Sequence, residues 1–311
     1  MKHSVKNGFT LIELSIVLII IGLIVGGILV GRDLITAAAV RAQLSQIEKY
    51  NSAVNTFRAK YGYLPGDIPE PYASQQGLAH RGQYAGEGDG NGLLECVLND
   101  VADSNVGYCQ AAGETVMFWS DLTYANGSNP NLIDGSFSTA STTSPNYTYL
   151  TGANLDLYLP KAKIGFGNYL YVFSGAWSPV ASGSQYSSYG ANYYGLSQAA
   201  GIDNTDLGEV LGPSTLPVYM AYAIDKKIDD GLPQSGNVVA RYLGGIFWRW
   251  AYGNPMATSG ACSPTGGPTT IATLPSTYTC YDNNGIVGPQ NYSMGFNNGN
   301  NTSCALSFKF Q

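Results

Sequence analysis

GFTLIEL, residues 8–14, opens an apolar run that continues to Gly31. The 23 residues of this run, 9–31, contain a single charged side chain, Glu13. As an α-helix with a rise of about 1.5 Å per residue, the run would be roughly 34 Å long, enough to cross a hydrocarbon core of about 30 Å. We therefore predict a membrane-spanning helix over residues 9–31.

The eight residues in front of this helix form a short basic leader. They include Lys2 and Lys6 and no acidic residue, and the next positive charge is Arg32. Because short basic flanks stay on the cytoplasmic side of a membrane, the N-terminus is expected in the cytoplasm and the rest of the chain outside it. Residues 1–8 are too short and too polar for a secretory signal, so we treat them as a targeting segment without a role in the fold.

Glu13 is unusual inside such a helix. A carboxylate costs on the order of 2.5–3.5 kcal/mol at the centre of a bilayer and less near its edge, so a partner is expected. A cut between Gly8 and Phe9 would create a new amine on Phe9, one helical turn from Glu13. In a stack of identical helices, that amine could neutralise Glu13 of a neighbouring copy. A glutamate tolerated at the membrane interface is the simpler alternative.

KNGFTLIEL, residues 6–14, resembles the leader and cleavage site of type IV prepilins and type II secretion pseudopilins. The resemblance is specific over residues 6–35 and weak over most of the chain. It implies cleavage after Gly8 by a membrane prepilin peptidase and N-methylation of Phe9. It also implies assembly with other pilin or pseudopilin subunits, on an inner-membrane platform, into a helical filament. The precursor would then be a single-pass protein of the bacterial inner membrane, and the mature chain part of a periplasmic or surface filament.

The helix is expected to continue beyond the membrane. Seven apolar residues recur at steps of three and four, which places them on one face of a helix over residues 32–61. Gly62 and Pro65 then end the helix. This amphipathic half should lie against a sheet, and a plain coiled-coil stalk is the alternative. The apolar stripe consists of Val40, Leu44, Ile47, Tyr50, Val54, Phe57 and Tyr61.

The remaining residues, 62–311, are enough for one sizeable core or two small ones. Apolar or alternating strand candidates follow a long helix, which predicts an α+β fold: a long N-terminal helix packed on a globular head with an antiparallel sheet. The strand candidates are residues 169–173, 238–250, 277–281 and 306–310, the last expected to be half-buried. The irregular regions are expected at 72–145, 174–200 and 253–303.

Charge and composition exclude some classes of partner. The net charge is −6, and it becomes −8 when Lys2 and Lys6 leave with the leader. An acidic chain is a poor candidate for binding nucleic acid, which needs a basic surface. Charged residues make up 12% of the chain, about half the usual share. The abundant Tyr, Asn and Ser either keep the head soluble or form contact loops.

All five cysteines lie in the head. None forms a CxxC pair, and only His80 remains as a histidine after processing, so a zinc site is not expected. An exported location permits disulfides. We favour Cys96–Cys109 and Cys262–Cys280, which would leave Cys304 free. The pilin resemblance makes Cys280–Cys304 a close alternative, because many pilins close a C-terminal loop with a disulfide.

Residues 86–92, GEGDGNG, resemble a calcium-binding loop in composition but lack the register of an EF-hand. Oxygens could come from Glu87, Asp89, Asn91 and Glu95. A solvent-exposed loop without metal is the simpler interpretation, so calcium is the only cofactor kept open. A second acidic group, Asp225 with Asp229 and Asp230, is explained by a short helix that ends at Gly231.

No catalytic pattern emerges from the sequence. There is no G-x-S-x-G elbow and no P-loop, and His80 stands in a polar loop. We therefore expect a structural filament subunit and not an enzyme. The alternative is a minor pilin whose head acts as a surface-binding or adhesive module. The sequence leaves open which system, pilus, secretion or DNA uptake, would use the subunit.

Overall fold

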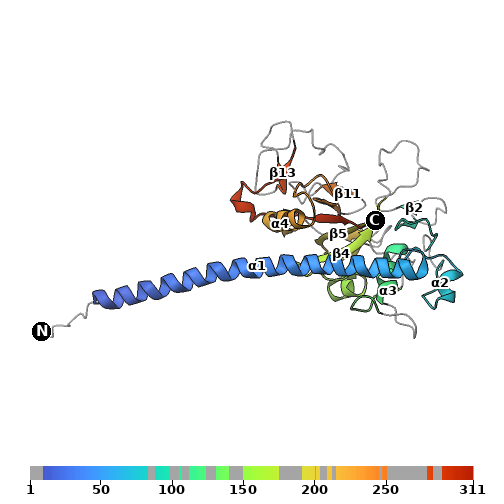
Figure 1. Ribbon diagram of the computed structural model, residues 1–311, viewed down its shortest axis with the longest axis horizontal. Coiled ribbons are helices and arrows are strands. Elements are labelled where there is room, and N and C mark those ends of the chain that lie inside the picture. Colours follow the sequence, from blue (N-terminus) through green and yellow to red (C-terminus); the bar gives the residue numbers. More distant parts are fainter. Residues whose placement is uncertain are drawn as a thin grey trace.

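A computed structural model shows one long helix that carries a head at its C-terminal half (Figure 1). Gly8 and Phe9, the predicted processing site, lie outside the described residues, and so does Glu87. The structure describes residues 10–82, 88–97, 105–106, 112–123, 131–139, 150–174, 191–199, 201–203, 209–211, 215–244, 247–250, 279–282 and 289–310.

Helix α1 covers Leu11–Tyr61, 51 residues, which corresponds to roughly 77 Å. It ends where the sequence predicts. Gly62 adopts a left-handed conformation with φ of 80°, and its N–H donates to the Arg58 carbonyl at 2.8 Å. Glycine takes this conformation without a Cβ clash, which makes it a favourable helix terminator. In the turn that follows, Gly66 has a φ of 89°, a conformation that favours glycine.

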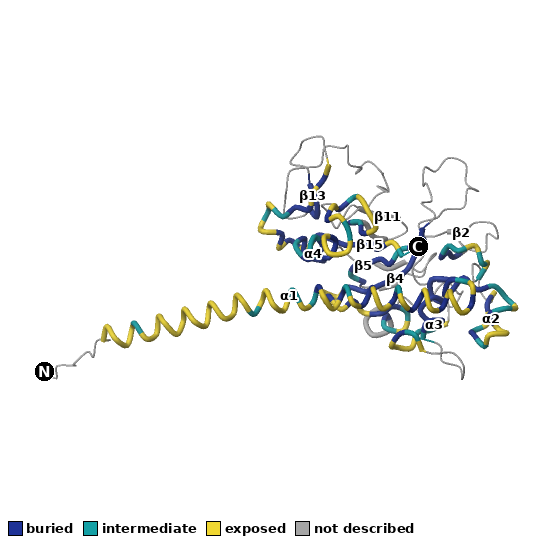
Figure 2. Tube along the Cα trace, in the orientation of Figure 1, coloured by how far each residue is buried: buried dark blue, intermediate teal, exposed yellow. Residues whose placement is uncertain are grey.

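The two halves of α1 differ in burial (Figure 2). Large apolar side chains from Leu11 to Ile35 are exposed, whereas the C-terminal half buries one face in the head. Among the described residues, α1 is the one helix long and apolar enough to cross a membrane. Its buried residues are Val40, Gln43, Gln46, Ile47, Tyr50, Ala53, Val54, Phe57 and Tyr61.

Polar and aromatic contacts dock this half of α1 on the head. Gln46 donates from Nε2 to the Lys161 carbonyl and accepts from the Lys163 N–H, both at 2.9 Å. Tyr50 packs edge-on against Trp119, with ring centroids 5.2 Å apart, and its ring lies 6.2 Å from that of Tyr194 in the sheet. The helix therefore meets the sheet through an aromatic cluster.

The central sheet has four antiparallel strands in the order β4-β5-β15-β9. It confirms the predicted α+β fold. The strands are β4 Asn168–Phe173, β5 Tyr193–Gln198, β15 Leu306–Lys309 and β9 Val238–Val239. The expectation that β15 is half-buried was wrong at Ser307, which is buried with Leu306 and Phe308, whereas Lys309 is exposed as expected.

Strand β5 lies within residues 174–200, which the sequence predicted as a loop. Its sequence, YYGLSQ, includes Gly195, which weakens a strand in isolation. Here the glycine is required, because a Cβ on Gly195 would come within 2.1 Å of the Tyr171 ring on β4. The packing of Tyr171 over Gly195 on the neighbouring strand thus explains why β5 forms, although the local sequence does not predict a strand there.

Several other elements differ from the expectation. Residues 238–250 form three short strands and not one, and β10 Arg241–Gly244 pairs with β11 Phe247–Trp250. Within the regions expected to be irregular lie helix α3, Glu114–Thr123, and strands β12 Tyr281–Asp282, β13 Asn291–Tyr292 and β14 Thr302–Cys304. Of the candidate strand 277–281, the last residue, Tyr281, belongs to β12.

The smaller elements complete the head. Helix α4, Val218–Ile228, packs beside α1 and ends three residues before Gly231, which has a φ of 76°. The others are α2 Tyr72–Gln75, β1 Cys96–Val97, β2 Asn105–Val106, β3 Leu150–Thr151, η1 Gly152–Leu157, β6 Gly201–Asp203, β7 Glu209–Leu211, β8 Leu216–Pro217 and η3 Asn297–Gly299.

The described disulfide joins Cys280 and Cys304, whose Cα atoms are 4.9 Å apart. The preferred pairing of Cys262 with Cys280, and the free Cys304, were therefore wrong. The physical reason is tertiary: β13, the partner of β12, and β14 both pack on α4, which brings the two cysteines together. Cys96 is also disulfide-bonded. Cys109 and Cys262 lie outside the described residues, so the pairing of Cys96 with Cys109 stays a prediction.

Candidate functional site

Glu13 is bonded to the residue that begins α1. Its Oε2 atom accepts hydrogen bonds from the Thr10 N–H and the Thr10 hydroxyl, each at 2.8 Å. The Glu13 N–H in turn donates to the Thr10 hydroxyl at 3.3 Å. This reciprocal pair is a capping box, which satisfies N–H groups that have no partner at a helix start. The T-x-x-E spacing could have predicted it, and our reading of the sequence missed this role.

The apolar half of α1 projects from the head, and its large apolar side chains are exposed (Figure 2). Its most hydrophobic stretch is 0% buried. An exposed apolar surface of this size marks a segment that is covered by lipid or by other protein. The segment is therefore suited to membrane anchoring or to helix bundling.

The described part of the acidic loop, from residue 88 onward, is closed by side-chain hydrogen bonds. Asn91 donates from Nδ2 to Asp89 Oδ2 and to Glu95 Oε2, both at 2.9 Å, so three of the four candidate ligands are in contact. The structure adds Asp67 and Glu114, whose carboxylate oxygens lie within 4.8 Å of one another and of Asp89. Sequence reasoning missed these two because they are distant in the chain.

Backbone N–H groups of this loop point at the two added carboxylates. Glu114 accepts from the N–H groups of residues 88, 89 and 95 at 2.9–3.2 Å. Asp67 accepts from those of Gly90 and Gly92 at 2.7 and 2.8 Å. Both glycines have positive φ, which lets the backbone turn its N–H groups inward. The Gly-x-Gly-x-Gly spacing therefore already has a structural role.

Burial raises the pKa of both carboxyl groups. It raises the pKa of Asp67 to about 7, against the opposing effect of the N–H donors. It raises the pKa of Glu114 well above its ordinary value, and the neighbouring Asp67 charge adds to this. Calcium binding at this loop stays a prediction. Calorimetric titration of the full chain with calcium tests it, and no heat with no thermal shift would exclude the site.

The second acidic group has its oxygens engaged. Asp225 accepts from the Gly231 N–H at 3.1 Å and from the Tyr292 hydroxyl at 2.7 Å. Asp229 accepts from the N–H groups of Asn237 and Val238. These bonds shape the chain that follows α4, and oxygens of Asp225, Asp229 and Asp230 lie within 4.8 Å of one another. His80 lies at the surface with its Nδ1 atom 3.0 Å from Glu70.

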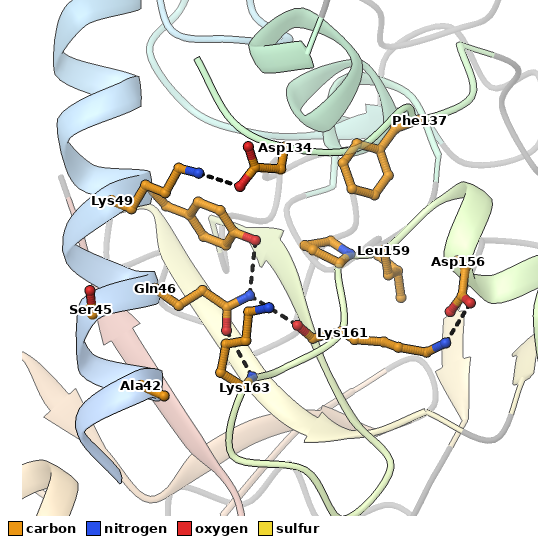
Figure 3. Close-up of a pocket in the computed structure, with 12 residues that line it drawn as sticks. Ala42, Ser45, Gln46, Lys49, Asp134, Phe137, Asp156, Leu159, Lys161 and Lys163 are labelled. Carbon is orange, nitrogen blue, oxygen red and sulfur yellow. Dashed lines mark hydrogen bonds and ion pairs between the residues drawn. The ribbon is translucent and has the colours of Figure 1, made fainter. Parts of the chain in front are cut away.

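A groove in the head, which we call the head groove, has a volume of about 510 Å³ (Figure 3). It lies between α1, the segment 131–139 and the segment 156–163. Tyr50 and Phe137 contribute aromatic surface. Two ion pairs, Lys49–Asp134 and Lys161–Asp156, flank it at 2.5 Å each.

Lys163 is the remaining charged residue of the head groove. It forms no ion pair within the described residues, although its charge helps Lys49 to lower the pKa of Asp134. Counting three lysines and two aspartates, the lining has a net charge of +1. The groove therefore suits a small ligand that combines an acidic group with an apolar or planar body.

A family model, the prokaryotic N-terminal methylation motif, matches residues 3–29. This motif is characteristic of type IV pilins and pseudopilins, so the resemblance predicted from residues 6–14 is confirmed. The match covers residues 3–8 and most of the exposed apolar part of α1, and it does not reach the head. No curated protein and no solved structure matches the chain.

The chain is thus pilin-like at its N-terminus, with an α+β head behind a helix suited to membrane anchoring. Proteins with this motif are generally structural and not enzymatic.

Proposed function

We propose that this protein is a structural subunit of a type IV pilus-like or type II secretion pseudopilus filament. A prepilin peptidase would cut between Gly8 and Phe9, and the mature chain would polymerise through α1. The observation that supports this most is the apolar half of α1, which carries the methylation motif and projects uncovered from the head.

The environment of this helix explains why it must assemble. In the inner membrane, lipid covers its apolar surface, and the precursor is a single-pass protein with a periplasmic head. Outside the bilayer, exposed apolar surface costs about 25 cal/mol per Å². A filament that leaves the membrane therefore has to bundle these helices, and small residues such as Gly22 and Gly26 allow close packing.

Glu13 gives the bundle its axial register in this proposal. In the isolated chain, the Glu13 carboxylate is bonded to Thr10, the residue directly after Phe9. Cleavage would place the new amine of Phe9 next to Thr10 and therefore near the Glu13 carboxylate. A neighbouring subunit that brings its Glu13 to this amine would neutralise both charges away from water. Subunits shifted along the axis would lose that pairing.

The substitution Glu13→Ala tests this function. We expect normal membrane insertion and leader cleavage, because the apolar run is unchanged, and loss of the protein from sheared filaments. Glu48→Ala is the matched control, since Glu48 is exposed on the same helix beyond the apolar half. Incorporation of Glu13→Ala at the wild-type level, seen by electron microscopy and immunoblot, would contradict the proposal.

A second candidate function is a binding module, a minor pilin that displays its head on a filament. The head groove favours it, because Lys163 has no ion pair among the described residues and aromatic rings lie beside it. Abundance separates the two functions: a major subunit dominates sheared filaments and a minor one is scarce. Lys163→Gln should leave assembly intact and reduce binding to an acidic-glycan array, whereas Lys309→Gln, also exposed, should change neither.

A further inference from the structure

A second groove lies where α1 leaves the head. It has a volume of about 690 Å³ and is formed by α1, α4 and the segment that contains η3. Figure 1 shows α4 at the end of the head that faces the projecting half of α1. We call it the membrane-proximal groove. Its lining includes Leu29, Arg32 and Asp33 of α1, Tyr219 and Lys227 of α4, and Asn300.

Its depth relative to a bilayer follows from helix geometry. Leu29 is 18 residues beyond Leu11, or about 27 Å along α1. If Leu11 lies near the inner edge of a hydrocarbon core of about 30 Å, Leu29 lies near the outer edge. Arg32, almost one turn further on, then reaches the headgroup layer. The groove therefore opens at the level of the lipid headgroups.

The charges of the groove favour an anion. Arg32 and Lys227 are both exposed, and neither forms an ion pair within the described residues. Asp33 is the one acid in the lining, so two cations face one carboxylate. The acids directly after α4 point elsewhere, because Asp229 and Asp230 accept hydrogen bonds from the segment 232–238.

Apolar residues next to these cations also fit a membrane surface. In the described part of the head, four large apolar side chains are exposed, and two of them, Ile228 and Leu232, follow Lys227 at the end of α4. Tyr219 and Tyr222 of the same helix are half-buried. Cations, aromatic rings and exposed aliphatic side chains together are typical of a segment that lies in the membrane interface.

We propose that the membrane-proximal groove binds the phosphate of anionic phospholipids, with Arg32 and Lys227 on either side of it. Guanidinium groups bind phosphate through paired hydrogen bonds, and an ammonium adds a point charge. This inference rests on the proposed function, because it requires α1 to span the membrane. The contact holds the head against the outer leaflet of the inner membrane, and assembly has to break it when the subunit leaves the bilayer.

The test uses the full chain in lipid nanodiscs, made of phosphatidylcholine alone or with phosphatidylglycerol added. Hydrogen–deuterium exchange is followed over residues 218–232. We expect slower exchange in the discs that contain phosphatidylglycerol. In the variant Arg32→Gln/Lys227→Gln the phosphatidylglycerol content needed for this protection should rise about fivefold for each charge removed. High salt should weaken the protection in the wild type, because exposed charges are screened.

The matched control is Arg58→Gln/Lys60→Gln, which removes two cations from the far end of the same helix, about 40 Å away. It should keep the wild-type protection. Equal exchange in both lipids, or equal loss in the control variant, would overturn the proposal. If protection is seen only when several copies share a disc, the groove binds a second copy of the chain and not lipid. That result would also overturn the proposal. Leader cleavage and filament incorporation are scored separately, so failure of the proposed function remains distinguishable.

Discussion

The carboxylate of Glu13 and the hydroxyl of Thr10 are 2.8 Å apart, joined by a hydrogen bond at the start of α1. The Thr10 N–H reaches the same carboxylate oxygen. Glu13 therefore has a hydrogen-bonding partner in the N-cap residue of its own helix. If this end of α1 enters a membrane, these bonds would lower the cost of burying Glu13 there.

Thr10→Val tests the capping role. Valine has nearly the shape of threonine but lacks the hydroxyl, so the start of α1 should lose about 1 kcal/mol of stability. We expect faster amide exchange over residues 10–14 of the full chain in lipid nanodiscs. Thr56→Val, at an exposed position inside the same helix, is the control and should leave those residues unchanged. Unchanged exchange in Thr10→Val would show that the capping box does not form in a bilayer.

Stability should fall as the pH rises through neutrality. Asp67 has a pKa of about 7 in the folded chain, raised by burial, whereas an unfolded aspartate has a pKa of about 4. Between these values the folded chain binds more protons than the unfolded chain, so the free energy of unfolding decreases with rising pH. Asp225, also near 7, acts in the same direction.

Thermal unfolding of the full chain in detergent, at pH 5 and pH 8, checks this direction. We expect the higher midpoint at pH 5. In Asp67→Asn the difference between the two midpoints should shrink, because one of the titrating groups is gone. A midpoint that rises from pH 5 to pH 8 would show that the N–H donors around Asp67 outweigh its burial.

The Arg81–Asp121 ion pair should be essential to the fold. The two side chains are 0% and 1% exposed, and Asp121 also accepts from the Gly66 N–H at the turn after α1. Asp121→Asn leaves a buried guanidinium without a counter-charge. The free energy of unfolding, measured with a chemical denaturant, should therefore fall by about 3–5 kcal/mol. The control, Asp134→Asn, breaks an exposed pair with Lys49 and should cost less than about 1 kcal/mol. Equal costs would contradict the prediction.

Gly195→Ala should destabilise the central sheet. The added methyl group would meet the Tyr171 ring at 2.1 Å, so the buried ring or the strand has to move, at about 1–3 kcal/mol. Gly295→Ala is the control, because no atom lies within 4 Å of its added Cβ. The measurement is the unfolding midpoint of each variant, and a Gly195→Ala midpoint equal to that of the control would refute the packing argument.

The sequence by itself was sufficient for the features that depend on neighbouring residues. The apolar run, the methylation motif around Phe9, the one-sided stripe of α1 and its end at Gly62 all follow from local spacing, because a helix is built from contacts three and four residues apart. The α+β class followed from the order of helix and strand patterns. The T-x-x-E cap at Thr10 was equally local and could have been predicted.

Tertiary structure decided what depends on distant residues. It brought Cys304 to Cys280 and Asp67 to Glu114. It also formed strand β5 around Gly195. Each of these depends on packing between segments far apart in the chain, where many pairings are compatible with the same local pattern. Burial in the fold also determines the pKa of Asp67, which is raised mainly by desolvation and not by its sequence neighbours alone.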